Sequence, residues 1–456
     1  MRGKSEKIWA DIDWTLIIIY LLIVTLGVSN IYSATYNPEH PGLFDLKTEH
    51  GKQIIWIGIS IFLGLIILFL EGSFIRKSSY WIYGIVMFLL VAVLFTDPIN
   101  GARSWFSIGS FGIQPSELGK LAACLALSAH LSTITVLRTR SKSGFGMFQL
   151  KNLFHTHWKT MAILATPAVL VLLQPDAGTF IVFTSFILVL YREGFAGNTL
   201  LFLLIAVIIA VITLVVADNS FILPVLKIKM GGKFGMLLAL LGMGLIFFLL
   251  IRYFVLKRNR PPLYRAMIGS LIVAILFVNF IEWGYSTFLK EHQKERIDLV
   301  LGKIEDPDGK GYNINRAKAA IGSGGFAGKG YRQATLANAS QKHVPMQSTD
   351  FIFCTWSEER GFIGSLALVL LYTFLLIKIL SIAERQRSKF TRIFAYCVAG
   401  IIFYHFMINV GMAIGLAPVI GIPLPLFSYG GSQVLAFSLL IFILIKLDSE
   451  RKIVLQ

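Results

Sequence analysis

The chain has 456 residues, of which 55% are hydrophobic and only 15% are charged. Soluble domains carry about 25% charged residues, so the composition excludes a soluble globular protein. The net charge of +17 would suggest a nucleic-acid partner in a soluble protein. In a membrane protein, however, Lys and Arg accumulate in cytoplasmic loops, and no nucleic-acid partner is expected. The cysteines form no CxxC pair, so neither a disulfide scaffold nor a zinc site is expected.

Apolar runs along the chain predict its fold class, because about 20 apolar residues are needed to cross the core of a bilayer. We predict an all-α, polytopic integral membrane protein with about 12 transmembrane helices in a single transmembrane domain over residues 1–456. The predicted spans are 14–34, 53–70, 79–96, 116–136, 160–174, 177–191, 199–217, 234–256, 265–287, 362–381, 393–414 and 431–447. The first run lacks a cleavage site and is too long for a signal peptide, so it is predicted to be a retained span.

The basic residues predict the orientation of these spans. If both termini are cytoplasmic, the connections that fall inside are the basic ones, as the positive-inside rule requires. One outer segment breaks the pattern, because residues 288–361 form a long polar loop that is rich in Lys and Arg. This extracytoplasmic loop is either a solvated basic segment or a site for an anionic substrate.

Ionisable residues inside spans are costly and usually face a cavity or a partner. Glu117 and Lys120 open the fourth span and share one helical face. They are either functional or a structural ion pair. Asp176 follows Pro175 at the start of the sixth span, where it is either functional or a simple helix N-cap.

Asp350 lies at the boundary between the long polar loop and the next apolar run. Partial burial there would raise its pKa toward a value useful for a general base. The alternative is a helix cap, with Glu358 and Glu359 as charges at the membrane interface. The glycine-rich stretch 322–330 fails the phosphate-loop pattern. It is either a flexible turn or a backbone that approaches a pyrophosphate. These features fit a transporter and an enzyme acting on a lipid-linked phosphate equally well.

Six motifs in order across most of the chain resemble the SEDS family (shape, elongation, division and sporulation proteins). They are Gly101–Trp105 with Gln114–Lys120, then Gln174–Thr179, Ala320–Gly325, Thr349–Phe353 with Glu358-Glu359, Asn409–Met412 and Gly421–Ser432. The first span and the Asp13-Trp14 pair at its start resemble the RodA-type members, which act in elongation, more than the FtsW-type members, which act in division.

The resemblance implies a peptidoglycan glycosyltransferase of the bacterial cytoplasmic membrane that polymerises lipid II at the outer face, for elongation and rod shape. By the family pattern Asp350 is the catalytic carboxylate, and Trp105, Glu117, Lys120 and Asp176 line or support the cavity. Stabilising a pyrophosphate leaving group needs positive charge, and the candidate residues are Arg296, Arg316, Lys318 and Lys329. A divalent cation (Mg²⁺ or Mn²⁺) is a candidate cofactor, and no organic cofactor is expected. The implied partners are a class B penicillin-binding protein and membrane proteins of the elongation complex.

The chain departs from the family pattern in its middle. The family usually has ten spans, so we interpret residues 199–256 as an inserted helix pair, which preserves the sidedness of Asp350. Three functional alternatives remain at this point: a lipid II flippase, an FtsW-type division glycosyltransferase, and a scaffold that recruits a transpeptidase.

Overall fold

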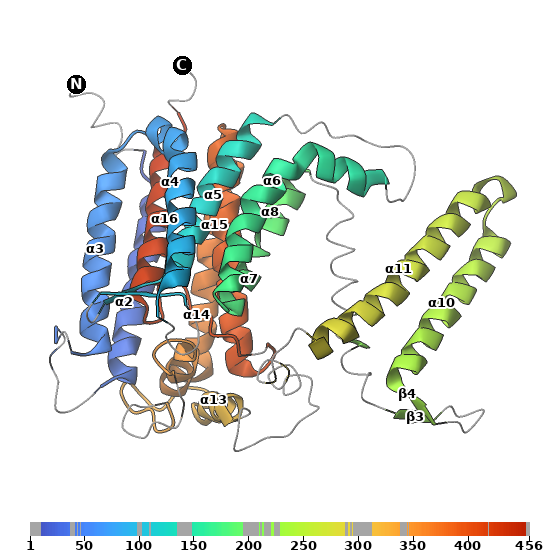
Figure 1. Cartoon of the computed structure of the whole chain (residues 1–456). Helices are drawn as coiled ribbons and strands as arrows, with labels where there is room; N and C mark the ends of the chain where they lie inside the picture. Colours follow the sequence, from blue (N-terminus) through green and yellow to red (C-terminus); the bar gives the residue numbers. More distant parts are fainter. Residues whose placement is uncertain are drawn as a thin grey trace. The chain divides into compact units, whose positions relative to one another are not determined.

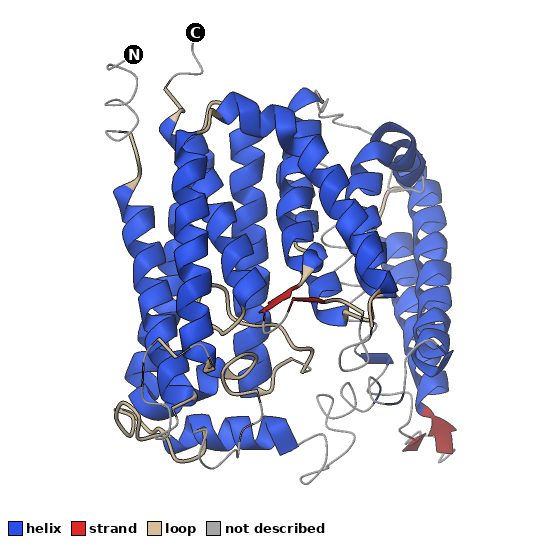
Figure 2. Cartoon of the chain, turned by 60° about the vertical axis from the view of Figure 1, so that its left-hand side comes forward, coloured by secondary structure: helices blue, strands red, loops and turns tan. Residues whose placement is uncertain are grey.

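The structure is a computed structural model of the whole chain. It describes residues 11–36, 42, 44–45, 47–97, 103–108, 111–134, 148–194, 209, 212–213, 220–222, 229–287, 291, 294, 312–337, 344, 346–417 and 419–452. By its internal contacts the chain divides into two compact units, the first formed by residues 1–135, 157–193 and 307–456 and the second by residues 136–156 and 194–306. In the described part of the chain, strands are confined to two short hairpins, and most of the rest is helical, with loops joining the helices (Figure 2).

The first unit is a bundle of membrane-length helices (Figure 1). Its elements are α2 (Trp14–Ala34), α3 (Glu49–Phe69), α4 (Gly72–Ala92), η1 (Val93–Phe95), β1 (Phe106–Ile108), β2 (Phe111–Ile113), α5 (Pro115–Thr133), α6 (Phe148–Leu173), α7 (Ala177–Phe183), α8 (Phe186–Arg192), α13 (Tyr312–Ser323), α14 (Ile352–Glu384), α15 (Lys389–Ile414) and α16 (Gly431–Ser449). Helix α6 begins in residues that belong to the second unit.

The second unit holds a strand hairpin and a helical hairpin. Its elements are β3 (Ser220–Ile222), β4 (Lys229–Gly231), α10 (Gly232–Phe254), η2 (Lys257–Asn259) and α11 (Arg260–Thr287). Met236 and Leu240 of α10 pack on Val278 of α11 in a small apolar cluster. The predicted insert at 199–256 falls within this unit, and its status as an insertion stays a prediction.

The first bundle has an inner layer of buried helices and an outer layer of more exposed helices. The most apolar windows of α15 and α16 are 72% and 83% buried, whereas that of α4 is only 22% buried. Helix α5 packs against both α15 and α16, and its buried face is rich in small residues such as Gly119, Ala122 and Ala126. Small side chains let helix backbones approach closely in a membrane, which places α5 next to the centre of the bundle.

The predicted fold class is confirmed, since eight helices of the described residues are long and apolar enough to cross a membrane. Shorter apolar helices over Trp158–Leu173 and Gly178–Arg192 match the fifth and sixth predicted spans, although a turn at Thr184 and Ser185 divides the sixth into α7 and α8. The predicted span 199–217 lies almost entirely outside the described residues, so the count of twelve stays a prediction.

The structure corrects the start of several predicted spans. Helix α4 begins at Gly72 rather than at 79, and α6 begins at Phe148 rather than at 160. Helix α14 begins at Ile352, ten residues before the span predicted at 362–381, and is kinked at Gly361 with φ 64° and ψ −161°. The apolar side chains of Ile352, Phe353 and Trp356 are buried in the bundle. The segment predicted as loop therefore continues into the membrane helix, and the sequence pattern missed this because Glu358-Glu359 and Gly361 interrupt the apolar run.

Candidate active site

Asp350 lies at the end of the bundle opposite the two ends of the described chain. Close to it, the Gln347 side chain donates to the carbonyl of Ala34, the last residue of α2 (2.8 Å). At the other end of α2, Lys452 forms an ion pair with Asp11 (2.5 Å). The Asp350 segment and the two chain ends therefore lie on opposite faces of the first unit.

Asp350 is half-buried, and its carboxylate lies against Gly421 in the loop between α15 and α16. A Cβ atom built on Gly421 would lie 3.4 Å from Asp350 Oδ2. Gly421 has φ +71°, a conformation that glycine adopts readily and other residues rarely do. This glycine lets the loop backbone approach the carboxylate closely while leaving the carboxylate partly exposed.

Asp176 caps α7 and fastens that short helix to α5. Its Oδ1 accepts from the amide of Thr179 (2.9 Å), and its Oδ2 accepts from the Gln114 side chain (2.9 Å). A Cβ atom on Gly178 would lie 2.7 Å from the carbonyl oxygen of Ile420. The start of α7 therefore packs on the same loop that Asp350 touches. Asp176 is the N-cap of this helix, and its functional role stays a prediction.

Glu117 and Lys120 form a fully buried ion pair with a third member that the sequence analysis missed. Lys120 Nζ lies 2.9 Å from Glu117 Oε1 and 2.7 Å from Nε2 of His405 in α15. His405 Nδ1 lies 3.2 Å from the carbonyl oxygen of Pro423. An ammonium can only donate, so His405 accepts at Nε2 and donates from Nδ1 to Pro423. Sequence gave no signal for His405, because the contact spans 285 positions.

Trp105 precedes the β1–β2 hairpin and packs on it. A Cβ atom on Gly112 in β2 would lie 3.0 Å from the Trp105 ring, and β2 itself packs against α16. The ring is half-buried. The contacts described for Trp105 are with its own hairpin and the preceding turn, so its predicted place in the cavity stays a prediction.

The predicted basic residues differ in their surroundings. Lys318 is exposed on α13, and its Nζ would lie 2.6 Å from a Cβ atom on Gly415, the C-cap of α15. The carboxyl end of a helix favours a cation. Arg316 is half-buried on the same helix. Arg296 lies outside the described residues.

Lys329 is engaged within the protein. Its ammonium donates to Ser323 Oγ (2.8 Å), to Thr335 Oγ1 (2.6 Å) and to Glu358 Oε1. An ammonium has three donors, and these contacts use all of them. A role in binding phosphate would require Lys329 to break at least one of these bonds.

The glycine-rich stretch 322–330 packs on the kink of α14. The amides of Lys329 and Gly330 donate to the carbonyls of Glu358 and Glu359 (3.1 and 2.9 Å). A Cβ atom on Gly328, which has φ +84°, would lie 2.2 Å from the Glu359 carbonyl oxygen. These two amides are therefore not available to a pyrophosphate, and the stretch packs against α14. Whether its other amides approach a pyrophosphate stays a prediction.

Glu358 and Glu359 are buried inside the protein, so the alternative that treats them as interfacial charges is wrong. Their exposed fractions are 0% and 1%. Glu358 accepts from the amides of Thr335, Leu336 and Ala337 at 2.8 to 3.0 Å. A buried carboxylate that accepts several amides is well stabilised, and this one fixes the fold of residues 329–337.

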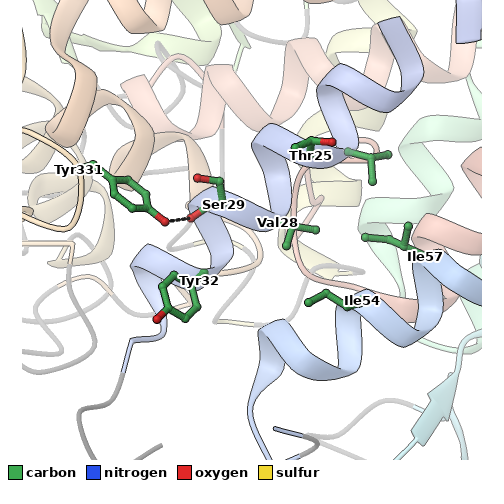
Figure 3. Close-up of a pocket in the computed structure, with 8 residues that line it drawn as sticks. Thr25, Val28, Ser29, Tyr32, Ile54, Ile57 and Tyr331 are labelled. Atoms are coloured by element: carbon green, nitrogen blue, oxygen red, sulfur yellow. Dashed lines mark hydrogen bonds between the residues drawn. The ribbon is translucent and has the colours of Figure 1, made fainter. Parts of the chain in front are cut away.

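An apolar groove of about 410 Å³ lies between α2 and α3 (Figure 3). Its lining residues are Val24, Thr25, Val28, Ser29, Tyr32, Ile54, Ile57 and Tyr331. The hydroxyl of Tyr331 donates to the carbonyl of Ser29 (3.2 Å) and closes one end. The next residue of α2, Asn30, donates to the carbonyl of Ile352 (3.1 Å). The polar end of the groove therefore lies on the same turn of α2 that contacts the start of α14, just after Asp350.

Comparisons with known proteins decide the family. The family model described as "Cell cycle protein" (FTSW_RODA_SPOVE) matches residues 13–222 and 266–453. The chain belongs to this family. The unmatched residues 223–265 overlap the predicted insert at 199–256 without coinciding with it.

Relatives of this SEDS-family chain include enzymes named for both elongation and division. Peptidoglycan glycosyltransferase RodA of Treponema pallidum (strain Nichols) is 30% identical, over 95% of each chain. A probable peptidoglycan glycosyltransferase FtsW of Buchnera aphidicola is 28% identical, over 96% of this chain and 92% of its own. The chain is therefore an enzyme of the peptidoglycan glycosyltransferase class, and the two identities do not decide between elongation and division.

A solved structure has a fold similar to that of this chain. The match is a chain in "Structural coordination of polymerization and crosslinking by a peptidoglycan synthase complex", with a TM-score of 0.62 and 24% identity, over 96% of this chain and 98% of that chain. At this identity the likeness shows the fold, which is the polytopic helical arrangement expected from the apolar runs.

Proposed function

We propose that the chain polymerises lipid II into glycan strands at the outer face of the bacterial cytoplasmic membrane, with Asp350 as general base. The observation that carries the proposal is the placement of Asp350, a half-buried carboxylate lying against Gly421 in the loop between α15 and α16. Both residues belong to motifs that resemble the family's. A partly desolvated carboxylate that keeps access to solvent suits proton abstraction.

The proposed reaction is one inverting displacement. Asp350 accepts the proton of the 4-hydroxyl group on the acceptor's GlcNAc as that oxygen forms a bond to the anomeric carbon of the donor. The bond from this carbon to the phosphate oxygen breaks, and the polyprenyl pyrophosphate leaves from the opposite face with the electron pair. The linkage inverts from α to β. Pyrophosphate is already a good leaving group, so the reaction needs no second carboxylic acid.

Positive charge near the leaving group lowers the barrier. Lys318 is the best-placed candidate, because it is exposed at the carboxyl end of α15, the helix that leads into the loop beside Asp350. Arg316 lies on the same helix, and Arg296 remains a candidate from its sequence position. Lys329 is the weakest candidate, because Glu358 and two hydroxyl groups use its three donors.

A divalent cation such as Mg²⁺ or Mn²⁺ would supply further positive charge. Among the described residues, no group of three His, Cys, Asp or Glu side chains is placed to hold a metal ion. Asp350 is the described carboxylate nearest the proposed reaction, so it is the candidate to contribute to holding such a cation. No step of the proposed reaction depends on the cation.

The charge distribution supports an outer location for Asp350. Basic residues gather at the end of the first unit that holds the chain ends, where Arg385 and Arg451 both contact Asp448. Positive charge marks the cytoplasmic side of membrane proteins. We therefore infer that both termini are cytoplasmic and that Asp350 faces outward, where lipid II is consumed.

The apolar groove between α2 and α3 supports a lipid-linked substrate. Its apolar part is formed by Val24, Val28, Ile54 and Ile57, and its polar end shares a turn of α2 with the contact to Ile352. We infer that a polyprenyl chain can lie along this groove with its phosphate end toward the Asp350 face.

The main alternative is a lipid II flippase that uses Glu117, Lys120 and Asp176 along a translocation path. In the structure Glu117 and Lys120 are 4% and 1% exposed and bonded to each other. This arrangement favours a structural ion pair over a path for a polar headgroup. A scaffold without catalysis is the third alternative, and it would tolerate loss of the Asp350 carboxylate.

We further propose a RodA-type role in elongation, on the resemblance of the first span, with an FtsW-type role in division as the alternative. A class B penicillin-binding protein is the proposed partner, supported by the synthase complex whose chain shares this fold. Complementation of strains depleted of either SEDS protein separates the two roles, because an elongation enzyme restores rod shape and a division enzyme restores septation.

Polymerisation of purified lipid II in detergent, with and without the transpeptidase partner, tests the reaction. Detergent offers no two sides to flip between, so glycan product indicates an enzyme. We expect Asp350→Asn to lower the rate by about 10²–10⁴-fold, the usual contribution of a general base. The matched control is Asp97→Asn, at an exposed position, which should keep wild-type activity. Full activity of Asp350→Asn would exclude the assignment.

A further inference from the structure

The turn that carries Asp350 is held by three donors from one region of the fold. The carbonyls of three consecutive residues each accept one hydrogen bond: Ser348 from the amide of Tyr429 (2.9 Å), Thr349 from Ser428 Oγ (2.7 Å) and Asp350 from Asn409 Nδ2 (2.8 Å). The donors come from α15 and from the loop 415–430. The main chain leading to the carboxylate is therefore fixed by residues far away in sequence.

Asn409 bonds to both main-chain segments that meet at the Asp350 carboxylate, the turn that carries Asp350 and the loop that carries Gly421. Its amide nitrogen also donates to the carbonyl of Ile422 (2.8 Å), and Ile422 follows Gly421, which touches Asp350. Asn409 is fully buried, and its own oxygen has no hydrogen-bond partner among the described residues. A buried polar group left unpaired is unfavourable, so the two hydrogen bonds from the amide nitrogen must outweigh the cost of the unpaired oxygen.

Ser428 makes a second side-chain hydrogen bond to the main chain of the turn. Its hydroxyl donates to Thr349 and accepts from the amide of Leu424 (2.8 Å). Gln53 of α3 holds the backbone beside it, donating to the Ser428 carbonyl (3.3 Å) and accepting from the amide of Gly430 (3.1 Å). The loop is thus anchored to α3 and α15 at once.

We propose that Asn409 and Ser428 are positioning residues for Asp350, a role that rests on the proposed function. They bond the main chain of the turn, and their bonds set the distance and direction of the carboxylate relative to Gly421. A general base must lie within hydrogen-bond reach of the proton that it takes, and a displacement of about 1 Å can lower a rate by about 10²-fold. Substrate binding depends on other groups, so the loss should fall on kcat.

The test uses purified full-length variants and lipid II in detergent. Asn409→Asp keeps the shape and removes at least one of the two donors, and Ser428→Ala removes one donor and one acceptor. The matched control is Asn259→Asp, because Asn259 is an exposed asparagine of η2, in the connection between α10 and α11. Each variant is measured for kcat, KM and melting temperature, beside Asp350→Asn.

We expect Asn409→Asp and Ser428→Ala to lower kcat by about 10–10²-fold with KM changed less than about 2-fold, while the control keeps wild-type values. Wild-type kcat in both variants would overturn the positioning role. A loss of activity that is fully explained by a loss of folded protein in the melting curves would also overturn the positioning role. A loss of activity that appears in KM rather than in kcat would overturn it as well. Failure of the proposed function is distinguishable, because in that case Asp350→Asn itself keeps full activity.

Discussion

Lys120 of α5 and His405 of α15 lie 2.7 Å apart between Nζ and Nε2, and this contact joins two helices at the centre of the bundle. His405 in turn reaches the carbonyl of Pro423, in the loop that touches Asp350. The Phe437 ring covers both, with its centroid 5.4 Å from Lys120 Nζ. The ion pair predicted from the sequence is therefore one part of a buried polar chain that ends at the loop against which Asp350 lies.

Replacing His405 by alanine should destabilise the protein. The change leaves one donor of the Lys120 ammonium and the Pro423 carbonyl without their partner, and each unpaired buried group costs about 1–3 kcal/mol. We expect a lower melting temperature in detergent. His405→Gln, which offers both an acceptor and a donor, should recover part of the loss, and equal melting temperatures for the two variants would contradict the hydrogen-bonded role.

A double-mutant cycle tests whether Glu117 and Lys120 act as a structural pair. Lys120→Met alone leaves a buried carboxylate uncompensated, which typically costs about 3–5 kcal/mol. Adding Glu117→Gln removes that charge, so the double variant should melt at a higher temperature than Lys120→Met. If the double variant is instead the less stable of the two, the residues contribute independently and the ion-pair interpretation is wrong.

Much of the fold could be predicted from the sequence, because lipid imposes a strong length and composition rule on membrane helices. The span 431–447 and the helix Gly431–Ser449 agree within a few residues. The start of α14 could not be predicted in this way. Its first ten residues contain Glu358 and Glu359, which are compatible with a buried helix only because the loop 329–337 supplies amides to them.

In the candidate site too, some residues could be predicted from their local sequence, whereas others depend on contacts with residues far away in the chain. Asp350 and Asp176 could be proposed because each lies at a local boundary between polar and apolar sequence. His405, Asn409 and Ser428 could not be assigned roles, since the hydrogen-bond partners of their side chains, except Leu424, lie 13 to 285 positions away. A polar residue within an apolar run signals only that a partner exists, and the fold decides which one.

Gly328→Ala should destabilise the packing of the glycine-rich stretch on α14. The new Cβ atom would lie 2.2 Å from the Glu359 carbonyl oxygen, at a residue with φ +84°. A left-handed conformation costs an ordinary residue about 1–2 kcal/mol, and overpacking adds about 1–3 kcal/mol. Gly322→Ala is the control, since nothing lies within 4 Å of its Cβ position. Similar melting temperatures for both variants would rule out the close packing.

The surroundings of Asp13 predict that stability depends on pH at the end of the bundle that holds the two chain ends. Burial raises its pKa, but hydrogen bonds from Lys378 and Arg385 outweigh this and place the pKa below its ordinary value of 3.8. A carboxylate with a depressed pKa in the folded state stabilises fully above its unfolded pKa and loses this contribution as the pH falls through the folded value. The wild type should therefore lose more stability below about pH 4 than Asp13→Asn. Parallel melting curves from pH 6 to pH 3 would contradict the prediction.

Lys318 and Lys329 provide the sharpest comparison between a functional and a structural cation. Lys318 is exposed beside Gly415, so Lys318→Met should keep the melting temperature and lower the polymerisation rate by about 10-fold or more, because it removes charge that stabilises the leaving pyrophosphate. Lys329 donates to the fully buried Glu358, so Lys329→Met should lower the melting temperature.

The exposed Lys389, at the start of α15, gives the control Lys389→Met, which should change neither quantity. Because all three changes remove one positive charge, a general effect of net charge on lipid II binding would appear equally in each. Rate and stability are measured on the same purified samples. If Lys318→Met loses stability in proportion to its rate while Lys329→Met loses rate alone, the two assignments are reversed, and the pyrophosphate lies over the glycine-rich stretch.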